Sequence, residues 1–178
     1  NSAYKFMKKY ILIIFISNFI YANFDAYSGY DFNQSLEIAN SGNYNMIGSF
    51  VFGIQKMHKL NNHSIGYGVE YISITKDKYS EDLQISIYDI FMKWNYAFNS
   101  RFGGFLRIGT SNSIDCDILG IEINTDRDLS YGFGLIINNI IQLSIISSSF
   151  SMERVPTFLF NQTLIDAKMT RINLSYLF

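Results

Sequence analysis

The sequence has little charge, one proline and one cysteine. Lys, Arg, Asp and Glu make up 16% of its 178 residues, against about 25% in an ordinary soluble domain. The formal net charge is −1, so the chain exerts no strong electrostatic attraction on nucleic acid. The single cysteine, Cys116, excludes an intrachain disulfide framework and a multi-cysteine zinc site. We therefore expect no nucleic-acid partner, no metal and no cofactor.

Long hydrophobic runs are also scarce, and the clearest one lies near the N-terminus. Met7–Lys9 carries two positive charges, Tyr10–Tyr21 is apolar, and Ala22 is a small residue at a plausible cleavage point. This order is typical of a secretory signal peptide, and the apolar run is shorter than the roughly 20 residues of a membrane-spanning helix. An uncleaved anchor is the alternative. We expect a signal peptide over 1–22, with 1–6 as an upstream extension, and one mature domain over 23–178.

After Ala22 the sequence alternates between apolar and polar residues with a period of two, which is typical of strands with one face buried. Turn signals such as Asn40–Asn43 and Asn138-Asn139 separate the alternating runs. The pattern predicts eight strands: Phe24–Ile38, Tyr44–Gln55, Ile65–Tyr71, Leu83–Tyr96, Phe102–Thr110, Leu129–Ile137, Ile141–Ile145 and Thr170–Phe178. A polar turn is expected at Lys56–His63, and two long loops at Ser111–Arg127 and Met152–Asp166.

The residue types in the two alternating rows indicate which row faces lipid. A water-soluble barrel places its apolar row inside and covers its exterior with Lys, Glu and Thr. Here the polar row is rich in Gly, Ser and Asn, which suit the narrow interior of an eight-stranded barrel. The apolar row is bulky, and Tyr and Trp near the run ends suit the interfaces of a membrane. The predicted interior charges are Asp25, Asp31, Glu37, Glu70, Arg107 and Arg171.

These features predict an all-β fold, an eight-stranded antiparallel up-and-down transmembrane β-barrel. Counted from the N-terminus, the two longest connections fall at the same end of such a barrel and the short turns at the other. This is the asymmetry expected of outer-membrane barrels, which have short periplasmic turns and longer external loops. Closure is required because an open sheet edge in hydrocarbon costs several kcal/mol for each unpaired backbone group.

The last eight residues, Arg171–Phe178, resemble the terminal strand of bacterial outer-membrane proteins. Ile172, Leu174, Tyr176 and Phe178 match its alternating apolar positions and its final aromatic residue. Ile65–Tyr71 and Tyr131–Leu135 also look like strands of the small OmpA/OmpX-type barrels, within the porin-like superfamily. The resemblance implies a monomeric barrel in the outer membrane of a Gram-negative bacterium. It also implies that the four terminal residues are an assembly signal read by the barrel-assembly machinery, and that outer-membrane lipid surrounds the barrel.

Candidate reactive residues are few. His58 and His63 lie in a predicted turn without nearby Cys or carboxylates, which favours solvated residues over a metal site. Asp115 and Asp117 flank Cys116 and disfavour its thiolate, so we expect an inert loop cysteine. Ser147–Ser149 approach the external rim, whereas both histidines fall on the other side, which argues against a Ser-His hydrolase.

The sequence therefore predicts a non-enzymatic scaffold that presents external loops for envelope structure, adhesion or surface interaction. The first alternative is a narrow pore for small solutes or ions, because the interior charges would line a conductive path. A charge-paired, closed interior is favoured, because eight strands leave only enough room for side chains. The second alternative is a lipid-modifying enzyme, which the placement of the histidines disfavours.

Overall fold

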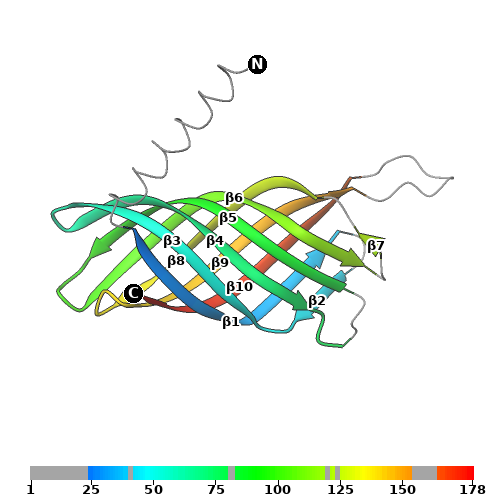
Figure 1. The fold of residues 1–178 in the computed structure, drawn as a ribbon, viewed down its shortest axis with the longest axis horizontal. Helices are drawn as coiled ribbons and strands as arrows, with labels where there is room; N and C mark the ends of the chain where they lie inside the picture. The colour runs from blue at the N-terminus through cyan, green and yellow to red at the C-terminus, as the bar shows by residue number, and fades with distance from the viewer. Residues whose placement is uncertain (1–23, 40–41, 80–82, 119–120, 123–124, 154–163) are drawn as a thin grey trace, which may run out of the picture.

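The computed structural model describes residues 24–39, 42–79, 83–118, 121–122, 125–153 and 164–178. Every regular element in these segments is a β-strand (Figure 1). No helix of the described residues has both the length and the apolar character needed to cross a membrane. The predicted signal peptide, 1–22, lies outside the described residues.

The described segments contain ten strands. They are β1 (Asp25–Ile38), β2 (Gly42–Met46), β3 (Ser49–Leu60), β4 (His63–Lys76), β5 (Leu83–Ala97), β6 (Phe102–Ile118), β7 (Ile121–Glu122), β8 (Thr125–Ile137), β9 (Ile141–Glu153) and β10 (Leu164–Leu177). All the pairings between them are antiparallel.

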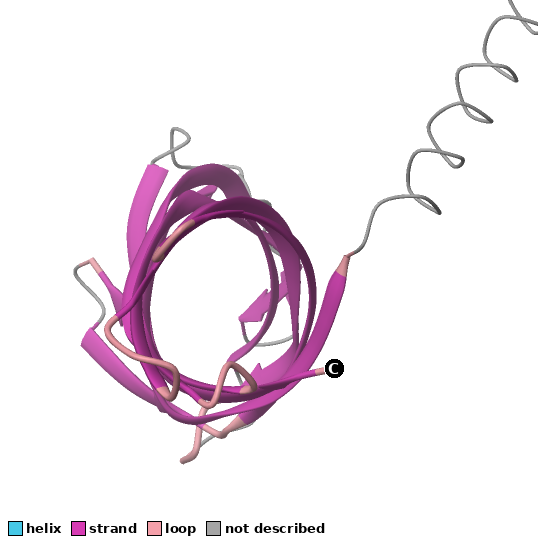
Figure 2. Cartoon of the chain, turned by 90° about the vertical axis from the view of Figure 1, so that its left-hand side faces the viewer, coloured by secondary structure: helices cyan, strands magenta, loops and turns pink. Residues whose placement is uncertain are grey.

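The strands close into a barrel with eight positions in its wall. The order is β10-β9-β8-β6-β5-β4-β3-β1, and β10 pairs with β1 to complete the ring, which Figure 2 shows end-on. β2 and β3 share one wall position, since β3 pairs with the first half of β1 and β2 with the second. β7 is a short addition to β6. The predicted fold is confirmed, and closure pairs both strand edges that hydrocarbon would penalise.

One end of the barrel, here called the turn end, carries short connections and Phe178 (Figure 1). Asn61 and Asn62 alone join β3 to β4, and Asn138–Ile140 joins β8 to β9. Asn61, Asn138 and Asn139 have φ of 57°, 52° and 62°, a left-handed conformation that asparagine tolerates. The predicted polar turn over Lys56–His63 is wrong in extent, because this tight asparagine turn lets both strands continue to its edge.

The opposite end is here called the loop end. β6 runs to Ile118 and β8 begins at Thr125, so much of the predicted loop Ser111–Arg127 is strand. β9 likewise runs to Glu153 and β10 begins at Leu164, while 154–163 lie outside the described residues. With 15 residues in β5 and 17 in β6, these strands exceed the roughly 9–11 residues that cross a bilayer.

Along most of the wall, bulky apolar side chains point outward and small or polar ones point inward. The outward set includes Phe50, Phe52, Tyr67, Val69, Ile90, Met92, Leu106, Ile108, Tyr131, Phe133, Leu135, Ile145, Leu174 and Tyr176, each at least 40% exposed. The inward set includes Gly53, Gly68, Gly132, Ser130, Ser144 and Ser175. This is the polarity of a membrane barrel.

Towards the loop end the polarity reverses. The interior there is an apolar cluster that includes Leu36, Ile38, Met46, Ile72, Leu83, Ile85, Ile87, Cys116, Phe150 and Met169. Several outward side chains at the same level are polar or charged, such as Glu37, Asp128 and Lys168, although Ile47 and Ile74 are exposed there too. This part of the barrel therefore has the polarity of a soluble β-barrel, with a core of its own.

A bulge in β1 corrects three expectations from the sequence. Strict alternation places Leu36 and Ile38 on the outward row and Glu37 in the interior. The register of β1 against β10 shifts between Asp31 and Asn33, so that Phe32 is the extra residue. Beyond it the faces exchange: Leu36 and Ile38 are buried inside, and Glu37 is exposed on the outer surface.

Candidate functional site

Five charged side chains meet in the middle of the barrel interior. Glu70 of β4 and Asp89 of β5 lie directly opposite each other, an arrangement in which like charges repel. Arg107 bridges them, with nitrogen–oxygen distances of 3.1 Å to Glu70 and 2.6 Å to Asp89. Arg171 bridges the same pair at 2.5 and 2.9 Å and also reaches Asp31 at 3.3 Å. All five are buried, and here they are called the charge cluster.

Alternation along five different strands places these side chains on the inner face, and small neighbours make room for them. Arg107 faces Gly132 across the β6–β8 pair. On its other side the Phe91 ring lies 4.1 Å from the guanidinium carbon, a cation–π distance. Arg107 thus lies between a glycine on one neighbouring strand and an aromatic ring on the other.

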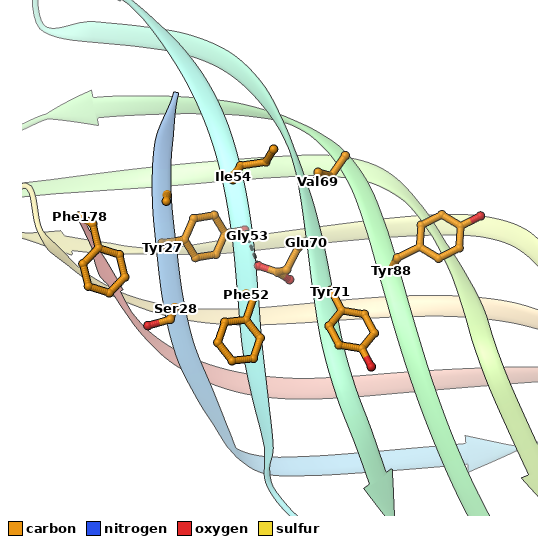
Figure 3. A pocket seen from close by; sticks show the side chains of 11 residues that line it. Tyr27, Ser28, Phe52, Gly53, Ile54, Val69, Glu70, Tyr71, Tyr88 and Phe178 are labelled. Carbon is orange, nitrogen blue, oxygen red and sulfur yellow. Dashed lines mark hydrogen bonds between the residues drawn. The ribbon is translucent and has the colours of Figure 1, made fainter. Parts of the chain in front are cut away.

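Hydroxyl groups donate further hydrogen bonds to two of the three carboxylates, Glu70 and Asp89. The Tyr27 hydroxyl donates to Glu70 Oε2 at 2.6 Å, the dashed line in Figure 3. Ser111 donates to Asp89 Oδ1, and Ser130 donates to Asp89 Oδ2 at 3.3 Å. Buried carboxylates are tolerated only when their lone pairs are occupied in this way. Figure 3 also shows the outward rings of Phe52 and Tyr71, on the strands that carry Gly53 and Glu70.

Lys93 forms a second polar layer nearer the turn end. Its ammonium group donates to Gln142 Oε1 at 2.6 Å and to Gln55 Oε1 at 3.2 Å. It also lies 4.1 Å from the centre of the Phe105 ring. No salt bridge among the described residues includes Lys93. With this lysine, the three buried cations of the two layers balance the three carboxylates of the charge cluster.

Open space in the interior is uneven along the axis. Between the charge cluster and Lys93 the void measures only about 10 Å³, which is room for about one water molecule. A cavity of about 470 Å³ lies at the turn end. Towards the loop end the interior contains the apolar cluster, together with the buried, hydrogen-bonded pair Gln34 and Ser49. The Lys93 layer and the charge cluster lie between the turn-end cavity and the loop end.

The structure brings together four of the six predicted interior charges. Asp31, Glu70, Arg107 and Arg171 form the charge cluster, whereas Asp25 lies half-buried beside the turn-end cavity. The sixth, Glu37, is the exposed residue beyond the β1 bulge.

Two residues of the candidate site, Asp89 and Lys93, are absent from the predicted interior charges. Both alternate with the outward row Tyr88, Ile90, Met92 and Trp94, which was the available signal. The apolar inward residues Leu83, Ile85 and Ile87 of the same strand obscured it, because they belong to the reversed part of the barrel.

The predicted terminal-strand residues lie along the outer face of β10, the strand that pairs with β1 to close the barrel. Leu174, Tyr176 and Phe178 are exposed and Ile172 is half-buried. The Phe178 backbone N–H donates to the Ala26 carbonyl at 2.8 Å. Its ring contacts Tyr176 edge to face at a centroid distance of 5.3 Å. The final residue thus extends the contact between the two ends of the barrel wall.

The candidate reactive residues do not assemble into a catalytic site. His58 and His63 lie in β3 and β4 at the turn end, and His63 Nδ1 accepts a hydrogen bond of 3.2 Å from the Trp94 indole. Cys116 is buried in the apolar cluster of β6, rather than in a loop. In the part of the chain that the structure describes, no group of three or more His, Cys, Asp or Glu side chains is arranged to hold a metal ion.

The closed wall and its outward apolar side chains define a small outer-membrane-type β-barrel, as the sequence predicted. No family model matches the sequence, and no curated protein sequence matches it.

Solved barrels of this class are similar over most of their length. Neisserial surface protein A is 13% identical, with 87% of this chain and 97% of that one covered and a TM-score of 0.49. The attachment invasion locus protein Ail of Yersinia pestis is 12% identical, with coverages of 87% and 97% and a TM-score of 0.47. The outer membrane protein OprG of Pseudomonas aeruginosa is 12% identical, with coverages of 87% and 95% and a TM-score of 0.42. At these identities the likeness concerns the fold alone.

Proposed function

We propose that this protein is a sealed outer-membrane scaffold whose role is to present the connections at its loop end to the cell exterior. In this proposal the signal peptide is removed after Ala22 and the barrel-assembly machinery inserts the mature chain. The turn end then faces the periplasm, following the usual asymmetry of such barrels. Envelope structure, adhesion and surface interaction are all roles that such a scaffold performs without catalysis.

The observation that carries this proposal is the double seal of the interior. The charge cluster joins side chains from β1, β4, β5, β6 and β10 through five salt bridges. The apolar cluster lies beyond it, and passage between apolar side chains is unfavourable for a hydrated ion. A permeating ion would have to break buried salt bridges and then pass between apolar side chains. The interior charges therefore support a sealed scaffold better than a narrow pore.

Planar-bilayer recording tests the seal. Refolded protein, identified as folded by its heat-modifiable gel mobility, should insert without producing stable conductance steps. A porin refolded in the same detergent is the positive control. Reproducible steps whose size changes in an Arg107→Gln variant would show a path through the charge cluster and would overturn the sealed scaffold in favour of the pore.

Location and processing are tested on the native protein. Fractionation of the expressing bacterium should place heat-modifiable protein in the outer membrane, with Asn23 as its first residue by N-terminal sequencing. An unprocessed chain in the inner membrane would contradict both the proposed location and the signal peptide.

A further inference from the structure

A groove crosses the outer face of the barrel wall, in the part whose outward side chains are bulky and apolar. Figure 3 shows this groove from close by, and its volume is about 630 Å³. It is called the outer groove here, and it extends from Phe178 over β1, β3 and β4 to Tyr88 of β5. Its lining between these two ends is mostly apolar and faces the surroundings of the barrel rather than the interior.

The pairing of the strands explains the shape of the outer groove. Two outward rows run side by side across the paired strands: one is Ser28, Phe52, Tyr71 and Tyr88, and the other is Ala26, Ile54 and Val69. On β1 both rows have a small side chain, whereas Phe52 and Tyr176 lie opposite Ser28 on the two neighbouring strands. The wall is therefore low over β1 and higher on both sides of it, which suits an elongated apolar ligand.

The end of the outer groove at Tyr88 contacts a cationic side chain. The Arg127 guanidinium donates to the Tyr88 hydroxyl at 3.2 Å and lies 6.0 Å from the centre of the ring. The Asn112 amide donates to the same hydroxyl at 3.3 Å. Arg127 is exposed, and no salt bridge among the described residues includes it. Since a guanidinium has five N–H donors, Arg127 has donors to offer an anion beside Tyr88.

This contact lies at the level where the outer face changes from apolar to polar. Towards the loop end, the outward row changes from Ile90 to Tyr88 in β5 and from Leu129 to Arg127 in β8. Tyrosine is enriched at membrane interfaces, where its ring meets hydrocarbon and its hydroxyl meets the headgroups. Arginine side chains also reach for this level. The outer groove therefore leads from the headgroup level into the hydrocarbon part of the wall.

The charges beside Arg127 make direct contact decisive. Asp126 and Asp128 precede and follow it and are exposed, so this segment has no general positive field. Asp128 lines a different hollow, together with Lys168 of β10. Selection of an anion at the end of the groove must therefore come from hydrogen bonds to the Arg127 guanidinium itself, a geometry that fits phosphate.

We propose that the outer groove is a binding site for one anionic phospholipid, with an acyl chain along the groove and the phosphate against Arg127. A lipid joins an anionic group to a hydrocarbon chain, and the groove joins a cation to an apolar lining. A second copy of the chain would match the apolar lining alone. The inference requires a membrane barrel but neither a sealed interior nor a particular orientation, so its test is separate from those of the scaffold.

Native mass spectrometry of the full-length barrel tests the site. The protein is refolded into vesicles of phosphatidylglycerol and phosphatidylcholine in equal amounts, with identical acyl chains, and is then transferred to mild detergent. We expect barrels that retain one phosphatidylglycerol molecule to outnumber those that retain one phosphatidylcholine about tenfold, the effect of one charge-assisted hydrogen bond. The choline ammonium group repels the guanidinium, which is the reason for the difference. Equal retention of the two lipids, or no retained lipid, would overturn the proposal.

Two pairs of variants tie the lipid to this groove. Arg127→Gln should abolish the preference for phosphatidylglycerol, whereas Lys168→Gln, which removes another exposed cation of the loop end, should keep it. Ala26→Leu fills the low part of the groove and should reduce retention of both lipids. Leu135→Phe adds bulk to an exposed outward side chain outside the groove and should retain lipid as the parent does.

Heat-modifiable mobility confirms that each variant is folded. A preference that persists in Arg127→Gln, or undiminished retention by Ala26→Leu, would contradict the assigned site. Lipid-free dimers of the barrel in place of the lipid complex would overturn the proposal in favour of a second copy of the chain.

Discussion

Arg171 is the residue on which the interior most depends, because its guanidinium contacts three carboxylates on three strands. It is 1% exposed, and it lies on the strand that closes the barrel. Burying such a group is unfavourable unless every partner is in place. The charge cluster therefore stabilises one particular register of β10 against β1 rather than adding general stability.

Replacing Arg171 by methionine should lower the free energy of unfolding by about 3–5 kcal/mol, because it leaves Asp31 without its guanidinium partner. The double variant Arg171→Met, Asp31→Asn should lose less than the single variant. Urea unfolding of the barrel refolded into lipid vesicles measures both. A double variant less stable than the single one would contradict the assigned pairing.

Gly53 controls the position of Tyr27. A Cβ atom at Gly53 would lie 2.2 Å from Tyr27 Cζ, so the ring can cover this strand only where a side chain is absent. The same ring carries the hydroxyl that donates to Glu70. A glycine in one strand thus determines a hydrogen bond between two others.

The variant Gly53→Ala should be less stable than the parent by about 1–3 kcal/mol, as overpacking generally is. Gly104→Ala is the control, because the nearest contact of its Cβ would be the end of the exposed Phe98 side chain, at 3.1 Å, and the Gly134 carbonyl oxygen would lie at an ordinary 3.6 Å. Denaturant midpoints of the two variants give the comparison. Equal midpoints would show that the Tyr27 ring moves aside without cost.

At the scale of the strand, the period of two predicts which face each side chain occupies in the part of the barrel with apolar outward residues. It does not predict this towards the loop end. Phe133 and Leu135 alternate with Gly132 and Gly134 as lipid-facing and inward residues, and the structure agrees. In β5 the period of two continues along the whole strand. The inward side chains, however, are apolar up to Ile87 and include charged residues beyond it. One sequence does not reveal where along a strand the surroundings change from lipid to water, so Asp89 was not recognised.

The bulge in β1 was hidden for a different reason. Phe32 is apolar and exposed, so it fits the outward row equally well with or without an extra residue. Only pairing with β10 fixes the register, and shear between strands is not encoded in the period of one strand. The pairs within the charge cluster were unpredictable on the same ground, since they depend on the relative heights of five strands.

The lipid-facing row gives a direct test at this scale. Phe133→Arg should destabilise the inserted barrel by about 2–4 kcal/mol if the ring lies near the bilayer midplane. Asn43→Arg, in the exposed strand β2 at the loop end, should be nearly neutral. Stability in vesicles, measured by denaturant titration, separates them, and equal tolerance of the two arginines would be incompatible with the assigned outer face.

At the loop end, where the apolar side chains point inward, we expect stability to depend on the inner face of the wall. Leu36 is fully buried inside the loop end, so Leu36→Ala should cost about 2–5 kcal/mol through the cavity it leaves. Its neighbour Ser35 is half-buried, and Ser35→Ala should have little effect. The same unfolding assay applies, and a neutral Leu36→Ala variant would mean that the apolar cluster does not act as a core.

At the scale of the whole molecule, the first and last strands, β1 and β10, pair to close the wall. By its resemblance to outer-membrane terminal strands, the end of β10 is a signal for assembly as well as the partner of β1. We expect Phe178→Asp to reduce the amount of folded protein in the outer membrane, at matched synthesis. Tyr79→Asp is the matched control, since the two rings are 75% and 78% exposed at opposite ends. Equal assembly of the two variants would remove the case for a terminal signal.

The reversal of polarity at the loop end has a consequence for how this protein tolerates change. In the proposed sealed scaffold the apolar cluster closes the interior below the loop-end connections, so changes in their length or sequence should leave permeability unchanged. In the proposed orientation, a foreign peptide inserted between β4 and β5 would be held by the loop-end part of the barrel, outside the lipid. In that proposal the membrane barrier and the loop-end surface depend on different residues, so each can change without altering the other.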